Sequence, residues 1–142
     1  MPGRPSASRR SVLRGAAATP LAGLGLTACS VPGAGGSVAA TPTAPVELGA
    51  DSEVAKGSAK LYRDHDVVVG RDAHGTLKAY STVCTHAGCP IDRLQGTTLI
   101  CPCHGSEFDA LTGKVVRAPA TEPLNALPVR TANGKIVAGP GA

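Results

Sequence analysis

The chain has 142 residues and a formal net charge of +4, with no Trp and few other aromatic residues. This length has room for one domain. Because large side chains are so few, the core is modest, and we expect a disulfide or a metal centre to stabilise the fold. Four of the 14 Lys and Arg residues precede Cys29, and the remainder balances ten basic against ten acidic residues. No basic patch therefore indicates a nucleic-acid partner.

Residues 1–28 are predicted to be an export signal. The segment SRRSVLR, which contains Arg9 and Arg10, resembles a twin-arginine signal, and the weakly apolar run after it is too short to span a bilayer. The sequence LTAC resembles a lipoprotein cleavage site, which makes Cys29 the first mature residue and the lipid carrier. The alternatives are an ordinary signal peptide with an incidental Cys29 and an uncleaved anchor. The predicted location is the outer face of the cytoplasmic membrane, where disulfides persist.

Residues 29–45 are predicted to be a lipid anchor and a flexible tether. The segment from Ser30 to Pro45 has no charge and no aromatic residue, a composition typical of linkers. A flexible coil of this length spans roughly 20–24 Å on average. An ordered arm that packs on the domain is the alternative, and it has little apolar material to support it.

Residues 46–142 are predicted to form one small all-β domain, because short β-like runs alternate with turns and no long helical period occurs. Turns at Asp72–Gly75 and Asn133-Gly134 predict two hairpins. We expect His65 and His74 to face solvent. The predicted strands are Val46–Leu48, Ala59–Tyr62, His65–Val69, Leu77–Ser81, Leu99–Ile100, Ser106–Phe108, Lys114–Val116, Leu127–Arg130 and Lys135–Ala138.

Two loops that contain Cys and His dominate this domain. They read CTHAGC, from Cys84 to Cys89, and CPCHGS, from Cys101 to Ser106. Soft thiolate and imidazole donors in two converging loops indicate a metal centre. Gly88 and Gly105 suit tight turns that bring backbone amides close to such a centre. A structural zinc site uses the same ligand types, and the spacing alone does not exclude it.

The stretch CTHAGCPIDRLQGTTLICPCHGSEFD resembles the Rieske iron–sulfur family, whose pattern is C-x-H, an interval and C-x-x-H. The resemblance implies one 2Fe-2S cluster, with Cys84 and Cys101 on one iron and His86 and His104 on the other. The implied fold is a small all-β domain of stacked antiparallel sheets with a two-loop cluster-binding tip. A β-sandwich with a peripheral zinc site has the same strand pattern.

The same resemblance implies a disulfide between Cys89 and Cys103, as in the respiratory branch of the family. A bridge there closes a loop of about 15 residues, worth roughly 3 kcal/mol in the chain-entropy account. With a lipid on Cys29, one disulfide and two iron ligands, all five cysteines are assigned. The segment Ala118-Pro119-Ala120 matches a proline segment that covers a third side of the cluster in the family.

The implied function is that of an exported, membrane-tethered protein that passes single electrons between a quinol or dehydrogenase partner and a cytochrome-like acceptor. Such a protein is an electron-transfer component of an oxidoreductase, and no catalytic residue is assigned. The alternatives are the small subunit of a dedicated oxidase, as in arsenite oxidase, and a zinc-stapled surface lipoprotein without redox chemistry. A ring-hydroxylating oxygenase is disfavoured, because it needs a separate mononuclear iron and only His65 and His74 remain to bind one.

The last residue of the second loop and the residue two positions further on predict the reduction potential. Ser106 matches a serine that donates to a bridging sulfide in high-potential members, whereas Phe108 replaces a tyrosine that donates to a ligand sulfur. Mixed Cys and His ligation gives about −150 to +300 mV, and hydrogen bonds to sulfur raise the potential. We predict a potential above those of oxygenase-type centres but below those of members with both donors. A redox titration under matched conditions tests this, and a value equal to that of the serine-plus-tyrosine members would contradict it.

Overall fold

The computed structural model describes residues 39–142, so the predicted signal with Arg9 and Arg10, and the predicted lipid site Cys29, lie outside the described residues. Within residues 39–142 no helix is long and apolar enough to cross a membrane. Two short 3-10 helices are present, η1 (Asp51–Glu53) and η2 (Arg63–His65). The strands are β1 (Val46–Ala50), β2 (Ser58–Tyr62), β3 (Val67–Arg71), β4 (Leu77–Ser81), β5 (Arg93–Gln95), β6 (Thr98–Ile100), β7 (Glu107–Asp109), β8 (Val115–Arg117), β9 (Ala126–Leu127), β10 (Val129–Ala132) and β11 (Lys135–Ala138).

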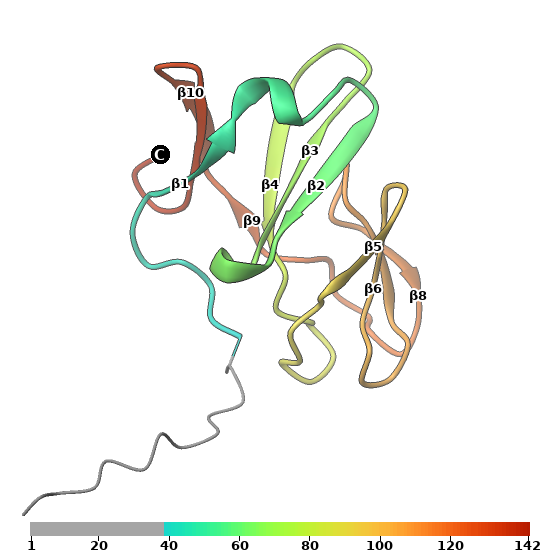
Figure 1. Ribbon diagram of the computed structural model, residues 1–142. Coiled ribbons are helices and arrows are strands. Elements are labelled where there is room, and N and C mark those ends of the chain that lie inside the picture. Colours follow the sequence, from blue (N-terminus) through green and yellow to red (C-terminus); the bar gives the residue numbers. More distant parts are fainter. Residues whose placement is uncertain (1–38) are drawn as a thin grey trace, which may run out of the picture. The chain divides into compact units, whose positions relative to one another are not determined.

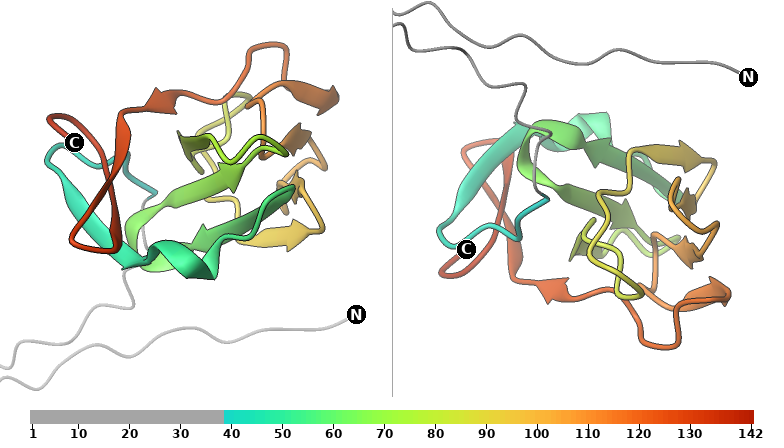
Figure 2. Two further views of the ribbon diagram at one scale, coloured as in Figure 1. Left: turned by 90° about the horizontal axis from the view of Figure 1, so that it is seen from above. Right: turned by 90° about the horizontal axis from the view of Figure 1, so that it is seen from below.

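The strands form three antiparallel sheets. Their orders are β1-β11-β10, β2-β3-β4-β9 and β5-β6-β7-β8. The β2-β3-β4-β9 sheet lies between the other two, with the β5–β8 sheet on one side and the β1-β11-β10 sheet on the other (Figure 1, Figure 2). The prediction of an all-β domain of stacked antiparallel sheets is confirmed.

Strand β3 is buried on both faces, which explains its unbroken run of valines. Val67, Val68 and Val69 are all fully buried. Val67 and Val69 pack with Ile136 of the β1-β11-β10 sheet, whereas Val68 packs with residues such as Phe108 of the β5-β6-β7-β8 sheet. Strands covered on both faces read as continuous apolar runs, and β-branched side chains fit the pleated surface well. The middle sheet is thus the core to which both other sheets are attached.

Strands β4 and β11 have the predicted bounds, whereas other strands differ from the prediction. The third predicted strand starts two residues late, because His65 belongs to η2 and Asp66 has a φ of 51°. The predicted strand at residues 127–130 is divided by Pro128, which has no N–H for a ladder. The chain changes sheets there, from β9 beside β4 to β10 beside β11. Strand β5 was not predicted.

Both predicted hairpin turns are present. Asn133 and Gly134 have φ values of 51° and 73° between β10 and β11, as a tight two-residue turn requires. In the other turn, Asp72 Oδ1 accepts hydrogen bonds from the backbone N–H of His74 (3.0 Å) and Thr76 (2.8 Å). These bonds hold the pKa of the Asp72 carboxyl below its ordinary value.

The β7–β8 pairing contains a bulge. Glu107 pairs with Arg117 and Phe108 pairs with Val115, so Val116 is an extra residue in the outer strand. Val116 is also the exposed large hydrophobic residue of the described chain, at 59% exposure. The bulge lies directly before the Ala118-Pro119-Ala120 segment, whose Ala118-Pro119 bond is cis.

Residues 39–45 differ from the flexible tether that their composition predicts. They lie against the domain, where the Ala40 N–H donates to Asp66 Oδ2 (2.9 Å) and the hydroxyls of Thr41 and Ser81 are 2.8 Å apart. These contacts are made by backbone and hydroxyl groups, which an apolar pattern does not reveal. The rest of the predicted tether lies outside the described residues.

Gly70 of β3 allows the middle sheet to approach the turn that follows β7 closely. A Cβ added there would lie 2.5 Å from the Ala110 carbonyl oxygen and 2.9 Å from Leu111 Cδ2. We predict that Gly70→Ala destabilises the fold by about 1–3 kcal/mol, the usual cost of overpacking. Urea unfolding tests this, with Lys78→Ala as the control, because Lys78 is the exposed residue opposite Gly70 on β4. Equal stability of the two variants would contradict the prediction.

Candidate metal centre

The two Cys- and His-containing loops share one hydrogen-bond pattern. In each loop the N–H of the first Cys donates to the carbonyl oxygen five residues later, from Cys84 to Cys89 and from Cys101 to Ser106 (both 2.8 Å). The Gly four residues on donates back to the carbonyl oxygen of that Cys, at 2.8 Å for Gly88 and 3.1 Å for Gly105. Both glycines have positive φ, 73° and 76°, which suits Gly. The loops are thus two copies of one tight turn.

The thiols of Cys84 and Cys101 lie together under the two loops. They are the free cysteines among residues 39–142, both are buried, and they contact each other. Burial raises the pKa of the Cys101 thiol, while the backbone N–H groups of Cys103 and His104 donate to its sulfur and oppose that rise. The two backbone N–H groups therefore offset part of the cost of placing negative charge on this buried sulfur.

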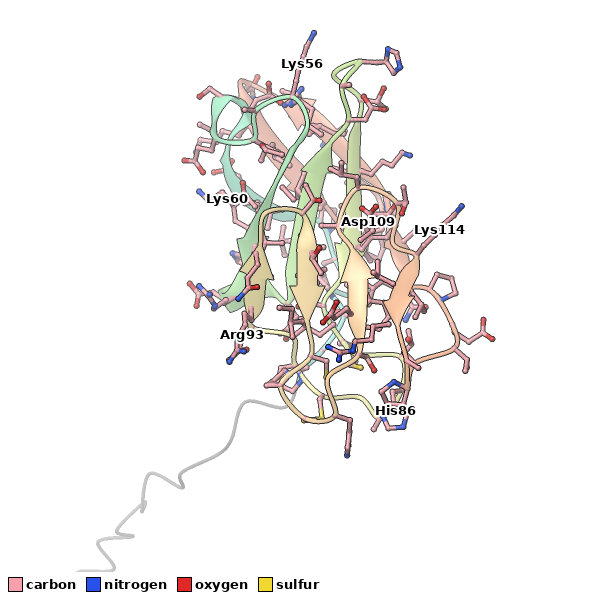
Figure 3. The ribbon with its side chains drawn as sticks, turned by 90° about the vertical axis from the view of Figure 1, so that its right-hand side faces the viewer. Lys56, Lys60, His86, Arg93, Asp109 and Lys114 are labelled. Carbon is pink, nitrogen blue, oxygen red and sulfur yellow. A yellow bond between two sulfur atoms is a disulfide. The ribbon has the colours of Figure 1, made fainter. Side chains whose placement is uncertain are left out.

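The imidazoles of His86 and His104 lie on the outside of the same two loops. Both residues are exposed, and their ring centroids are 4.8 Å apart with an interplanar angle of 84°. Figure 3 shows His86 beyond the ends of strands β5–β8, whereas Asp109 and Lys114 lie further along the sheet. The tip therefore has a buried thiol pair and an exposed imidazole pair.

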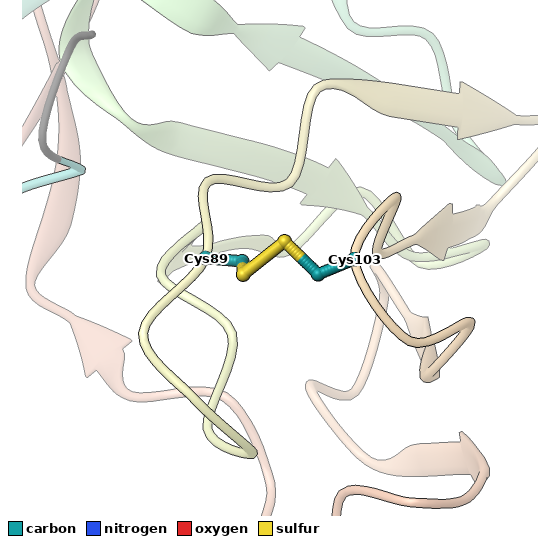
Figure 4. The surroundings of a disulfide bond; sticks show 2 residues. All are labelled: Cys89 and Cys103. Carbon is teal, nitrogen blue, oxygen red and sulfur yellow. A yellow bond between two sulfur atoms is a disulfide. The ribbon is translucent and has the colours of Figure 1, made fainter. Parts of the chain in front are cut away.

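A disulfide joins the two loops. The predicted Cys89–Cys103 bridge is present, with 6.5 Å between the Cα atoms and 14 residues of sequence separation (Figure 4). The sulfurs of Cys89, Cys101 and Cys103 lie within 4.8 Å of one another. Because Cys89 and Cys103 are bonded to each other, Cys101 alone of the three keeps a thiol for a metal.

A third segment, residues 118–124, is hydrogen-bonded to both loops. Thr85 Oγ1 of the first loop donates to the Glu122 carbonyl oxygen (2.7 Å), and the Ala120 N–H donates to Ser106 Oγ of the second loop (3.0 Å). Leu124 is buried beyond them, and its N–H donates to the Gly113 carbonyl oxygen (2.9 Å). The proline segment that the sequence predicts beside the centre is thus attached to both metal-binding loops.

Ser106 and Phe108, the predicted tuning positions, are both fully buried. Within residues 39–142, Ser106 Oγ accepts from Ala120, which leaves its own hydroxyl hydrogen to donate elsewhere. Phe108 packs in the same core cluster as Cys84 and Cys101 and has no polar atom to offer. One hydroxyl donor thus stands close to the buried thiols, and a phenyl ring occupies the other position.

The donor set fits a 2Fe-2S cluster with mixed ligands. Such a cluster uses two thiolates and two imidazoles as ligands, and it accepts hydrogen bonds at its sulfurs. The site offers two thiols, two imidazoles, backbone donors to one ligand sulfur and one buried hydroxyl whose hydrogen is free to donate. The structure brings the predicted ligands together as two pairs.

Sequence reasoning missed the Thr85–Glu122 and Ser106–Ala120 bonds, because a hydroxyl with a distant backbone partner leaves no local pattern. His74 is exposed, as predicted, whereas His65 is half-buried beside residues 40–44.

Comparison with known proteins gives consistent results. Residues 44–128 match the family model of the Rieske 2Fe-2S domain. The cytochrome b6-f complex iron-sulfur subunit of Chlorobaculum tepidum is 36% identical over 92 residues, which cover 63% of this chain and 50% of that protein. Subunit 1 of the same name from Nostoc sp. is 37% identical over 121 residues, covering 75% of this chain and 66% of that protein. This chain thus spans about half to two thirds of these relatives.

Among solved structures, naphthalene 1,2-dioxygenase bound to phenanthrene is similar with a TM-score of 0.54 and 21% identity. The similar part covers 68% of this chain and 26% of that chain. At this level of identity the likeness concerns the fold alone.

We predict that Ser106→Ala destabilises the tip, because it leaves the buried Ala120 N–H without its acceptor. The expected loss is about 1–3 kcal/mol in unfolding free energy. Urea unfolding measures it, with Ser58→Ala as the control, because Ser58 Oγ bonds the Ala55 carbonyl oxygen at the surface. A loss no larger than that of the control would show that the Ser106 bond does not hold the third segment.

Proposed function

The chain belongs to the Rieske 2Fe-2S family, and on that premise we propose that it is an exported, membrane-tethered carrier of single electrons between redox partners. The observation that carries the proposal is the pairing of two buried thiols with two exposed imidazoles on one two-loop tip. Such a site has one side insulated by the protein and one side open to a partner.

The family implies one 2Fe-2S cluster, and this chain supplies a ligand set for it. Cys84 and Cys101 would hold the buried iron, and His86 and His104 would hold the exposed one. Bound there, the cluster accepts and releases one electron at a time. The Cys89–Cys103 disulfide keeps the two loops together, so the four ligands stay within reach of one centre.

The chain's own groups favour the negative charge that arrives with an electron. The backbone N–H groups of Cys103 and His104 favour negative charge on the Cys101 sulfur, and the Ser106 hydroxyl has a hydrogen left to donate. Donors to sulfur stabilise the reduced state and raise the potential. Phe108 excludes water from the buried side without adding a donor. The exposed imidazoles of His86 and His104 are open to contact with a partner.

The partner part of the proposal is supported by the relatives. Those of Chlorobaculum tepidum and Nostoc sp. are named as iron-sulfur subunits of cytochrome b6-f complexes. We infer that this chain likewise works beside a quinol-oxidising or dehydrogenase partner and delivers electrons to a cytochrome-like acceptor. It is then a component of an oxidoreductase, with the partner supplying the oxidation chemistry. As the small subunit of a dedicated oxidase, the chain would have the same role but would receive its electrons from a different donor.

The location is the outer face of the cytoplasmic membrane. Support comes from Arg9 and Arg10 in a twin-arginine-like segment and from Cys29 in a lipoprotein-like cleavage site. The Cys89–Cys103 disulfide is consistent with it, because disulfides persist in oxidising compartments.

Electron paramagnetic resonance (EPR) of the dithionite-reduced protein, with iron and zinc analysis of the same sample, tests the centre. We expect a rhombic signal with a mean g value of mixed Cys and His ligation, and about two irons per chain. His104→Ala should lose this signal, whereas His74→Ala, an exposed His in the Asp72–Gly75 turn, should keep it. One zinc per chain and no signal, in protein purified from its own host, would leave the zinc-stapled lipoprotein as the function.

A further inference from the structure

Residues 39–45, here called the docked arm, contact the two residues that hold the start of the first cluster loop. The Ala40 N–H donates to Asp66 Oδ2 (2.9 Å), and Asp66 uses its own carbonyl oxygen to accept the Thr82 N–H (2.8 Å). The Thr41 hydroxyl lies 2.8 Å from the Ser81 hydroxyl. Both of these hydrogen bonds are therefore made to residues that also hold the segment entering the loop.

Ser81 relays the second contact. Its side chain is fully buried, and its Oγ also accepts the Val83 N–H at 3.3 Å. A buried hydroxyl keeps a defined orientation only while its partners hold it. Val83 pairs with Pro90 across the mouth of the loop, and Cys84 follows it. Hydrogen bonds thus run from Thr41 through Ser81 to the residue before the first proposed ligand.

The C-terminal segment is shaped to receive the arm. Gly139 has a φ of 113°, and a Cβ there would lie 2.6 Å from the Ala44 carbonyl oxygen and 3.5 Å from Pro42 Cβ. At Gly141 a Cβ would touch the Pro45 ring at 3.6 Å. Only a residue without a side chain allows the arm's backbone to pass so close at Gly139. On its other side, the arm and residues 64–66 line a hollow of about 420 Å³.

We propose that Thr41 and Ser81 are positioning residues for the first cluster loop, so that the arm's docking sets how firmly Cys84 and His86 are held. The ligand roles rest on the proposed function, whereas the coupling from arm to loop does not. While docked, the arm limits motion of the loop entrance. When Thr41 is removed, Ser81 loses a partner in a buried place, and the Val83 N–H loses a fixed acceptor.

The test compares Thr41→Val with Thr43→Val in the full-length, cluster-loaded protein. Thr43 is an exposed residue of the same arm, and its hydroxyl makes no hydrogen bond with residues 39–142, so it is a matched control. Hydrogen–deuterium exchange is followed over residues 82–88 and, as an internal reference, over the second loop at residues 101–106. EPR g values of the reduced protein are the second readout, because a purely structural effect elsewhere would not move them.

Thr41→Val should speed exchange of residues 82–88 about fivefold, the factor that corresponds to about 1 kcal/mol of hydrogen-bond free energy, and shift the g values. Residues 101–106 should be unchanged, and Thr41→Ser, which keeps the hydroxyl, should match the wild type. Wild-type exchange or wild-type g values in Thr41→Val would overturn the proposal, as would equal effects in Thr43→Val. The proposed function fails separately, by the metal content and the EPR signal of the wild type.

Discussion

The hydrogen bond from the Ala120 N–H to the Ser106 hydroxyl joins parts of the tip that the sheet topology leaves separate. The second cluster loop enters β7, and the 118–124 segment follows β8, so the bulged β7–β8 pairing alone relates them. The Thr85–Glu122 bond joins the first loop to the third segment, and the Cys89–Cys103 disulfide joins the two loops. Each of the three parts is thus attached to the other two. These directional contacts add to the apolar packing of the core cluster beneath the loops.

The position of the two side-chain pairs divides the site into an inner and an outer half. The inner half is continuous with the core, where Phe108, Leu99 and Ile91 surround the thiols. The outer half consists of the two exposed imidazoles and the short loop backbone that carries them. The polar groups of the inner half are backbone N–H groups and the Ser106 hydroxyl. The polarity of the site is therefore built from the loop conformation itself.

The elements that the sequence predicted are those with local causes. The runs of β4 and β11, the Asn133-Gly134 turn and the Cys and His spacing each carry their own signal, and the resemblance correctly implied the Cys89–Cys103 bridge. The features that sequence analysis missed depend on partners that are distant in the chain. Pro128 divides a predicted strand because two sheets compete for its flanks, and the docked arm is held by hydroxyl and backbone groups that match Gly139 almost a hundred residues later. The ligand roles themselves stay predictions until a metal is measured.

The bulge at Val116 has a consequence for behaviour at high protein concentration. Strand β8 is the outer strand of its sheet, and a regular outer strand offers its free N–H and C=O groups to another copy of the same strand. The extra residue twists this edge and interrupts the ladder where the exposed valine lies. Arg117, paired with Glu107 at 2.9 Å, adds a charge at the same place. Edge-to-edge association of two copies through β8 is thereby disfavoured.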